Sequence, residues 1–172
     1  MKIDGEQRTQ PDARQPATDA EVTPDTSMNG GTDSGGMGMV FAACMAKGYT
    51  ANGTLTSLYR VGANSKSWVD AETECATDVA GATHLVVLSS PAESQFIQTT
   101  LGWVGLSDRA TEGTFVNVTA EPNDQRPFLS GQPDNGGGDE NCVQMKSGGL
   151  DDDQCSNDHV FVCECDGRPP TP

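Results

Sequence analysis

Cations are scarce in this chain. Its 172 residues include 10 lysines and arginines against 25 aspartates and glutamates, which gives a formal net charge of −15. Nucleic-acid backbones and anionic membrane surfaces repel a chain of this charge, so we expect neither as a partner. Long apolar runs are also missing, because no segment approaches the roughly 18 residues of a membrane-spanning helix. Membrane insertion is therefore not expected.

Hydrophobic and aromatic residues are few, at 34% and 5% of the chain, whereas glycine occurs 20 times. A chain of this length can bury one core, and this composition predicts a loop-rich domain with limited regular structure. The first six residues lack the apolar segment of a signal peptide. The two histidines, His84 and His159, are isolated, and His84 begins an apolar run typical of a buried strand. Its position is typical of a strand end rather than of a catalytic base.

Cysteine, by contrast, is well represented. An even number of cysteines without paired Cys-x-x-Cys spacing favours disulfides in an oxidising compartment over a thiolate metal site. The spacing alone leaves about fifteen pairings open. The cysteines are Cys44, Cys75, Cys142, Cys155, Cys163 and Cys165.

Acidic residues gather in the stretch from Gln132 to Cys155, where six carboxylates accompany the single cation Lys146. Such a cluster repels itself unless solvent, protonation or a cation relieves it. Carboxylate and amide oxygens suit Ca²⁺, which takes six to eight oxygens and tolerates irregular geometry. The alternative reading is a solvated acidic loop, the usual fate of a charge run.

Local patterns predict two helices and several strands. Ser67 is positioned to cap a helix that ends near Gly81 and presents Trp68 to the core. Ser90 and Glu93 have the spacing of a capping box around Pro91, which predicts a second helix start. Strands are expected over residues 41–44, 54–61, 84–88 and from 103 to 106.

Six motifs, spread in order along the chain, resemble the C-type lectin domain family. The loop contains Gln-Pro-Asp at 132–134, Glu-Asn-Cys at 140–142 and Leu-Asp-Asp at 150–152. Elsewhere, residues 67–75 resemble the first helix of the family, Trp-Val-Gly-Leu at 103–106 its Trp-Ile-Gly-Leu strand, and Phe-Val-Cys-Glu at 161–164 its final strand. The resemblance covers residues 41–166 and implies an α+β C-type lectin-like fold: two helices flanking small antiparallel sheets, with a long calcium-binding loop and stabilising disulfides.

The resemblance implies a Ca²⁺ site and a sugar site in the loop. Pro133 is expected to follow a cis peptide bond, and the Gln-Pro-Asp tripeptide is associated in the family with galactose-type recognition. The residue usually found as Asn is Asp151 here, and an ionised Asp cannot donate a hydrogen bond to a sugar. The implied Ca²⁺ ligands are Gln132, Asp134, Glu140, Asp151 and Asp152, of which Gln132, Asp134, Glu140 and Asp151 also contact carbohydrate.

The same likeness implies one further site and raises one competing motif. A second, auxiliary metal site would use Asp108, Glu112, Asn135, Glu140 and Asn141. Glu-Pro-Asn at 121–123 spells the mannose-type tripeptide, but it lies 19 residues before Glu140, whereas Gln-Pro-Asp lies eight before it. We therefore interpret residues 121–123 as a turn.

The family also implies a disulfide pattern. Cys75 would pair with Cys163 and Cys142 with Cys155, which leaves Cys44 for Cys165. That third bridge departs from the family, whose longer form has an N-terminal pair close together in sequence.

The expected organisation is a disordered linker over residues 1–40, the lectin-like domain over 41–166 and a flexible tail over 167–172. The expected function is calcium-dependent carbohydrate binding, without catalysis, at the cell surface or outside the cell. The alternative is a calcium-stabilised adhesion module that binds a cell-surface protein rather than a glycan.

Overall fold

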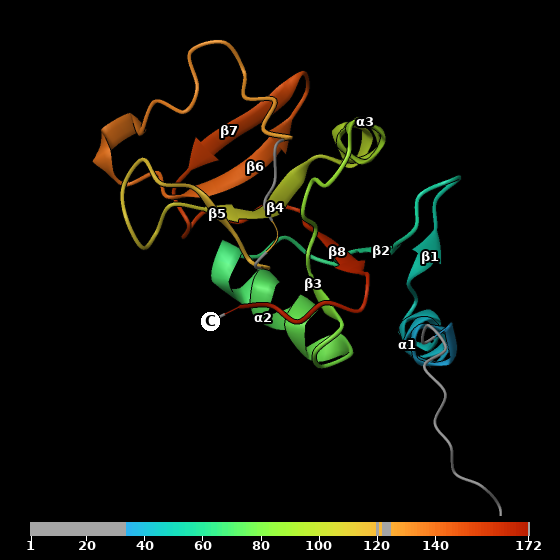
Figure 1. Cartoon of the computed structure of the whole chain (residues 1–172). Helices are drawn as coiled ribbons and strands as arrows, with labels where there is room; N and C mark the ends of the chain where they lie inside the picture. The colour runs from blue at the N-terminus through green and yellow to red at the C-terminus, as the bar shows by residue number, and fades with distance from the viewer. Residues whose placement is uncertain (1–33, 120, 122–124, 172) are drawn as a thin grey trace, which may run out of the picture. The chain divides into compact units, whose positions relative to one another are not determined.

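The computed structural model describes residues 34–119, 121 and 125–171 (Figure 1). In this part of the chain it contains three α-helices, eight strands and one 3-10 turn. In chain order they are α1 (Ser34–Ala46), β1 (Thr50–Ala51), β2 (Leu58–Val61), α2 (Trp68–Asp78), β3 (Thr83–Leu85), α3 (Pro91–Thr100), β4 (Gly102–Ser107), β5 (Val116–Asn117), η1 (Gly136–Gly138), β6 (Cys142–Lys146), β7 (Gly149–Asp153) and β8 (Val162–Cys165).

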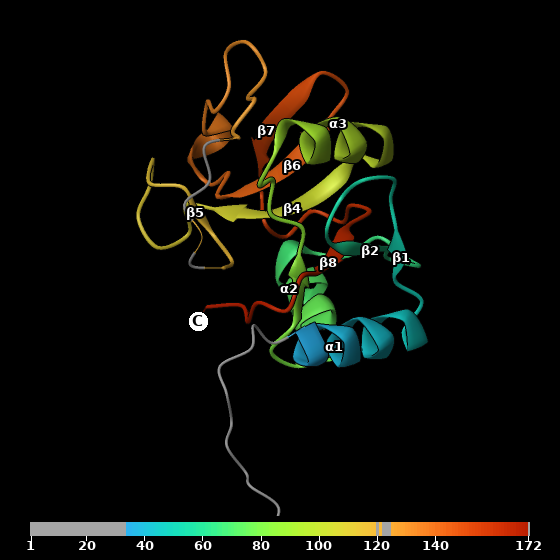
Figure 2. The same cartoon turned by 45° about the vertical axis from the view of Figure 1, so that its right-hand side comes forward.

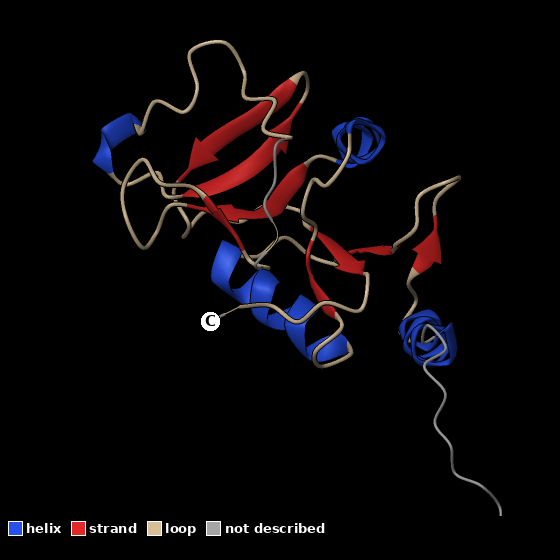
Figure 3. Ribbon diagram, in the orientation of Figure 1, coloured by secondary structure: helices blue, strands red, loops and turns tan. Residues whose placement is uncertain are grey.

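The strands form two four-stranded antiparallel sheets, with the orders β1-β2-β8-β3 and β5-β4-β6-β7 (Figure 3). Helix α2 lies alongside β3 and β8, while α3 lies alongside β4 and β6 (Figures 1 and 2). The predicted α+β class with small antiparallel sheets is confirmed. The prediction of two flanking helices holds for α2 and α3, and α1 is an additional helix.

Helix α2 forms as its sequence predicts. The Ser67 hydroxyl accepts a hydrogen bond from the Asp70 amide, which caps the first turn. Trp68, Ala71 and Cys75 lie on one face and are buried. Trp68 donates its indole N–H to the Val104 carbonyl at 2.8 Å, so this tryptophan belongs to the core and links the helix to β4.

Helix α3 begins at the predicted cap, with one difference. The Ser90 hydroxyl accepts from the Glu93 amide, as a capping box requires. The Glu93 carboxylate, however, reaches back to the amide and hydroxyl of Ser89, both at 2.7 Å, and accepts from the Tyr59 hydroxyl at 2.6 Å. Glu93 therefore joins the helix start to β2 as well as capping it.

Helix α1 differs from the sequence-based expectation. Residues 41–44 were expected to form a strand, but they lie within this helix. Val40 and Phe41 pack against the core and Cys44 is fully buried, so tertiary contacts support a glycine-containing helix of weak propensity. The helix ends where Tyr49 donates its amide to the Cys44 carbonyl, and Gly48 takes a left-handed conformation (φ 86°).

The expected domain limits also differ from the structure. The boundary between residues 40 and 41 falls inside α1, and residues 1–33 of the expected linker lie outside the described residues. At the other end, the segment expected to be a flexible tail is hydrogen-bonded to the domain. Gly167 donates to the Ala82 carbonyl, and both the amide and hydroxyl of Thr171 donate to the Val118 carbonyl.

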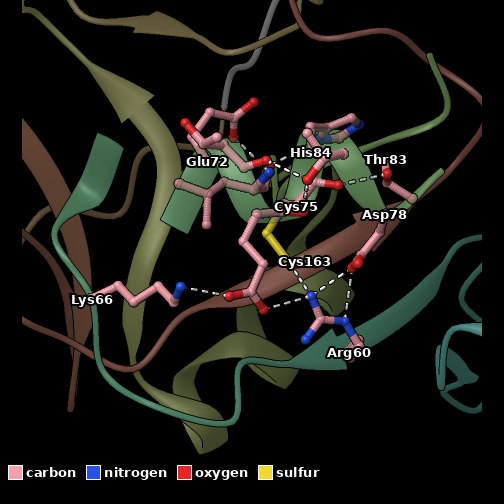
Figure 4. The surroundings of a disulfide bond; sticks show 12 residues. Arg60, Lys66, Glu72, Cys75, Asp78, Thr83, His84 and Cys163 are labelled. Atoms are coloured by element: carbon pink, nitrogen blue, oxygen red, sulfur yellow. Dashed lines mark hydrogen bonds and ion pairs between the residues drawn. A yellow bond between two sulfur atoms is a disulfide. The ribbon is translucent and has the colours of Figure 1, made fainter. Parts of the chain in front are cut away.

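All three implied disulfides are present: Cys44–Cys165, Cys75–Cys163 and Cys142–Cys155. The first ties α1 to β8, the second ties α2 to β8, and the third closes the hairpin of β6 and β7. The second bridge lies beside Arg60, whose guanidinium contacts Asp78 (Figure 4). Two of the bridges thus anchor helices to β8, an interior strand of one sheet, and the third stabilises the other sheet.

Candidate metal and carbohydrate site

Three carboxylates from the loop and from β7 converge on one point. Asp134, Glu140 and Asp152 each place an oxygen within 4.8 Å of the oxygens of the other two. Two oxygens bound to one Ca²⁺ at about 2.3–2.6 Å can be at most roughly 5 Å apart. The three carboxylates therefore already satisfy the spacing that a shared calcium ion demands.

Asp152 positions the loop that carries the other two acids. It is 2% exposed, and its two oxygens accept hydrogen bonds from the backbone amides of Asp134 (3.1 Å) and Asn135 (2.8 Å). Strand β7 fixes Asp152 through its pairing with Val143 of β6. The loop start is therefore attached to a rigid sheet through a single carboxylate.

Glu140 closes the other end of the loop. Its carboxylate accepts from the Gly136 amide at 2.6 Å, and its own amide donates to the Asn135 side-chain oxygen at 3.1 Å. A methyl group at Gly136 would lie only 2.8 Å from Glu140 Oε2. Glycine at this position therefore allows the carboxylate to approach the turn.

The three acids have no neutralising side chain among the described residues. No lysine, arginine or histidine of the described residues forms an ion pair with any of them. Burial raises the pKa of Glu140, and the charges of Asp152 and Asp134 raise it further, although the Gly136 amide opposes the shift. The arrangement accumulates negative charge that a divalent cation would relieve.

Gln132 adds a neutral oxygen at the start of the loop. The Gln132–Pro133 peptide bond is cis, as the family resemblance implies. Within the described part of the chain, the side-chain oxygen Oε1 of Gln132 is buried and accepts no hydrogen bond. A buried acceptor without a partner costs about 1–3 kcal/mol, and a bound cation or a water molecule would satisfy it.

Asp151 is not part of this group, contrary to the sequence-based assignment. Successive side chains of a strand point to opposite faces, so Asp151 and Asp152 diverge along β7. The Asp151 carboxylate instead contacts Lys146 Nζ at 2.6 Å and the Gln144 side-chain amide at 3.3 Å. Gln144 is its cross-strand partner on β6.

The next acid in the run, Asp153, is engaged by the scaffold. Its carboxylate contacts His159 Nε2 at 2.7 Å and accepts hydrogen bonds from Gln144, Asn157 and the Gln154 amide. Burial alone would raise the pKa of Asp153, but these contacts lower it. Hence the acidic run at 151–153 contributes one member, Asp152, to the three-carboxylate group.

The carboxylates of the auxiliary metal site implied by the sequence do not converge in the described part of the chain, although Asp108 Oδ1 is buried without a hydrogen-bond partner there, and the second site stays a prediction. Asp108 is buried and accepts from the Gly113 amide, whereas Glu112 is exposed to solvent. In the described part of the chain, Asp108, Glu112 and Glu140 do not come within a shared coordination distance. Asn135 bonds instead to Glu140, and Asn141 accepts from the Asp108 amide through its carbonyl. In the alternative tripeptide at 121–123, residues 122 and 123 lie outside the described residues.

Comparisons with known proteins decide the family. The lectin C-type domain family matches residues 64–165. Echinoidin of Heliocidaris crassispina is 32% identical over 131 residues, which cover 63% of this chain and 89% of echinoidin.

The chain belongs to the C-type lectin domain family.

Other members extend the comparison. C-type lectin domain family 4 member M of Hylobates lar is 34% identical over 115 residues, covering 62% of this chain but only 28% of that relative. The chain thus spans about a quarter of the length of that longer protein. Among solved structures, the cow carbohydrate-recognition domain of CD23, crystallised in the presence of a GlcNAc2Man3 oligosaccharide, is 28% identical with a TM-score of 0.60. The alignment covers 72% of this chain and 99% of that structure.

The fold alone does not fix the ligand. A calcium-independent type II antifreeze protein has the same fold, with 24% identity and a TM-score of 0.61 over 68% of this chain and 90% of its own. The C-type lectin family consists of binding domains rather than enzymes, and this chain is accordingly a non-catalytic domain. None of the helices in the described part of the chain has the length and apolar character that a membrane crossing requires.

This C-type lectin domain contains a second group of titratable residues, which the sequence reading did not identify. His84, Glu164 and Asp166 lie together in the core, because His84 of β3 pairs with Glu164 of β8. His84 contacts the Leu85 carbonyl through Nδ1 (2.8 Å) and Asp166 through Nε2 (3.0 Å). Since both ring nitrogens face acceptors, the ring is best satisfied as an imidazolium. This group already contains its own cation and needs no metal.

Proposed function

We propose that this domain binds carbohydrate through a calcium ion held by Gln132, Asp134, Glu140 and Asp152. The observation that carries the proposal is the convergence of three carboxylates without a cationic partner in the described part of the chain. The unpartnered Gln132 oxygen, two residues before Asp134, supports it as a fourth ligand. Charged and neutral oxygens in this combination suit Ca²⁺ better than softer metals.

The donor set leaves room for a sugar. Ca²⁺ takes six to eight oxygens, so four protein groups leave coordination positions for exogenous hydroxyls. The carboxylates of Asp134 and Glu140 can accept hydrogen bonds from such hydroxyls, and the amide of Gln132 can donate one. A pair of neighbouring sugar hydroxyls could then bind the ion and its protein ligands together.

Galactose-type sugars are the favoured class because the tripeptide is Gln-Pro-Asp. Residues 135–138, directly after it, are Asn and three glycines and offer no aromatic ring for the apolar face of galactose. The tripeptide therefore supports galactose, but residues 135–138 provide no aromatic ring that could stack on the sugar. Three disulfides and the absence of a free cysteine support a setting outside the cell or at its surface.

Calorimetry with calcium and a glycan array test the proposal. Protein stripped with EDTA should bind about one Ca²⁺ per chain, and glycan binding should require that ion. Asp134→Asn and Asp152→Asn should each weaken calcium binding by at least tenfold, because each removes a charged ligand. Asp158→Asn, which changes an exposed acid outside the site, is the matched control. Absence of calcium binding at neutral pH by the unmodified protein would reject the proposal.

A second candidate is a calcium-stabilised module that binds a cell-surface protein. It is favoured by the contact of Asp151 with Lys146, which removes one expected sugar contact from the site. Under this alternative, calcium binds with the same stoichiometry but the glycan array remains blank. Binding to a protein target that free galactose does not reduce would support it.

A further inference from the structure

A groove lies between helix α3 and the connection from β1 to β2, residues 52–57 (Figures 1 and 2). Its volume is about 580 Å³, which falls within the roughly 300–1,000 Å³ of small-molecule sites in proteins. A second hollow of about 370 Å³ adjoins it, because Asn52 and Phe96 line both. We call the first hollow the α3 groove. The side chains that determine its chemistry are Asn52, Thr54, Leu55, Gln95 and Phe96.

The polar side chains of the α3 groove are not used by the fold. Asn52 is half-buried, whereas Thr54 and Gln95 are exposed. In the described part of the chain, none of these three side chains forms a hydrogen bond or an ion pair. A side-chain amide and a hydroxyl each both donate and accept hydrogen bonds. The groove therefore offers both kinds of partner to a ligand without first breaking a contact within the protein.

The apolar surface of the groove is held in place. Leu55 and Phe96 are half-buried and pack against the core. The ring of Tyr59 meets that of Phe96 edge-on, with 5.0 Å between the ring centroids. Tyr59 itself is buried and donates its hydroxyl to Glu93 at 2.6 Å. The Phe96 ring is thus fixed in orientation beside free amide and hydroxyl groups, an arrangement suited to a ligand that is apolar on one face and polar at its edge.

Charge narrows the class of ligand. Although the chain has a formal net charge of −15, none of the described residues that line the α3 groove is ionisable. The adjoining hollow includes Arg60, whose guanidinium is already paired with Glu74 and Asp78. An anionic ligand would find no free cation here and would enter the negative field of the protein. A cationic ligand would find no carboxylate in the lining.

We propose that the α3 groove binds a neutral glycan without calcium. The apolar face of a pyranose ring would pack on Phe96 and Leu55, and its hydroxyls would exchange hydrogen bonds with Asn52 and Gln95. The three-carboxylate group lies on residues 134–140 and β7 and shares no residue with this groove. This second site therefore goes beyond the proposed function and does not rest on it.

A glycan array probed in EDTA is the first test, because EDTA removes any contribution of calcium. The chain is displayed in many copies on a bead, which allows weak binding to be detected. Residues 52–54, Asn-Gly-Thr, have the form of an N-glycosylation acceptor, so the protein is produced in a bacterial host to keep Asn52 unmodified. Neutral glycans should be retained in EDTA, whereas sialylated and sulfated ones should not.

Variants locate the binding. The strongest retained neutral glycan is titrated in EDTA and followed by the amide NMR signals of the chain. Gln95→Ala and Asn52→Ala should each weaken binding by about fivefold, the loss of one hydrogen bond. Phe96→Leu should weaken it by about tenfold, and its Tm is measured as well because this ring packs on the core. Gln98→Ala is the matched control, since Gln98 lies on the same helix but lines neither hollow.

Several results would overturn the inference. They are retention of no neutral glycan in EDTA, retention that Gln95→Ala and Asn52→Ala leave unchanged, and binding of an extended peptide library in place of glycans.

Calcium separates this inference from the proposed function. Glycan binding that occurs with calcium and disappears completely in EDTA would reject the inference and leave the proposed function standing. Binding in EDTA by a chain that takes up no calcium would support the inference and reject the proposed function. Asp152→Asn should leave the EDTA-resistant binding unchanged, because Asp152 is not part of the groove.

Discussion

At the scale of single residues, the proposed calcium site depends on how closely a backbone can approach a carboxylate. Gly136 donates its amide to Glu140, and a Cβ at this position would lie 2.8 Å and 3.0 Å from the two Glu140 oxygens. Gly136→Ala should therefore displace the end of the Glu140 side chain. Since that end is flexible, the free energy of unfolding without calcium should change by less than about 0.5 kcal/mol.

Calcium affinity should nevertheless fall by about tenfold in Gly136→Ala, which corresponds to roughly 1.4 kcal/mol, because one charged ligand is misplaced. Calorimetric titration of the EDTA-stripped variant measures this loss. Gly36→Ala is the control, because a Cβ at Gly36 in α1 meets no atom within 4 Å. Equal calcium affinities for both variants would show that Glu140 is not a ligand.

Residue order in the sequence located most of this site but not all of it. The motifs predicted that Asp134, Glu140 and Asp152 converge, and the structure brings these three together; that Gln132 joins them as a ligand stays a prediction. The assignment of Asp151 was wrong on geometry, because adjacent residues of a strand face opposite sides and Lys146 meets Asp151 across the hairpin. That contact depends on register, which the motif does not encode.

At the scale of elements, local signals predicted the helices that cap themselves. The hydroxyls of Ser67 and Ser90 each accept a hydrogen bond from a backbone amide in the first turn of a helix. Such hydrogen bonds depend only on residues within one turn. Helix α1 was missed because it has neither a charged residue nor a clear apolar stripe over Ser34–Ala46. Its formation depends on a disulfide to residue 165 and on core contacts of Val40 and Phe41, which are distant in sequence.

The paired strands β3 and β8 predict a pH dependence of stability. Burial alone would lower the pKa of His84, but the hydrogen bond to Asp166 and the charge of Glu164 raise it to about 9. The unfolded value is about 6.5, so this stabilisation is complete below pH 6.5 and is lost as the pH rises through 9. Burial also raises the pKa of Glu164 and that of Glu72, so the folded state disfavours their ionisation. Their ionisation therefore lowers the free energy of unfolding as well, over a pH range that overlaps that of His84.

Denaturant unfolding in EDTA should therefore show a free energy that falls by roughly 2–3 kcal/mol between pH 6.5 and 9.5. All six cysteines form disulfides, so no free thiol is available to start disulfide exchange at the alkaline end of this range. His84→Gln should be less stable at pH 6.5, because Asp166 loses one of its two cationic partners and keeps only Arg168, and its decline with pH should be shallower. A constant free energy across this range in the unmodified protein would contradict the imidazolium assignment.

At the scale of the whole molecule, the two sheets differ in the disulfides and charged groups that they hold. The sheet β1-β2-β8-β3 holds two disulfides and the buried His84 group, whereas β5-β4-β6-β7 carries the three-carboxylate group at β7. The first sheet is stabilised by covalent bonds and by a buried internal cation. The second has one disulfide, Cys142–Cys155, and three acids without a cationic side chain among the described residues. Calcium should therefore matter most for the second sheet and its loop.

This division predicts how calcium changes the stability of the protein. An ion that binds only the folded chain at a hundred times its Kd adds about 2.7 kcal/mol to the free energy of unfolding, which corresponds to a rise in Tm of roughly 5–10 °C. Calorimetric melting with calcium and with EDTA should show this difference.

Magnesium at equal concentration is the control for charge screening. It should reproduce little of the rise in Tm, because Mg²⁺ requires near-octahedral geometry at shorter distances. Screening of the net charge of −15, by contrast, would respond equally to either ion. Asp152→Asn should show a smaller calcium-induced rise in Tm than the unmodified protein at the same calcium concentration. Equal Tm values for the unmodified protein would mean that its carboxylates hold no calcium, and equal effects of the two ions would mean that only screening is at work.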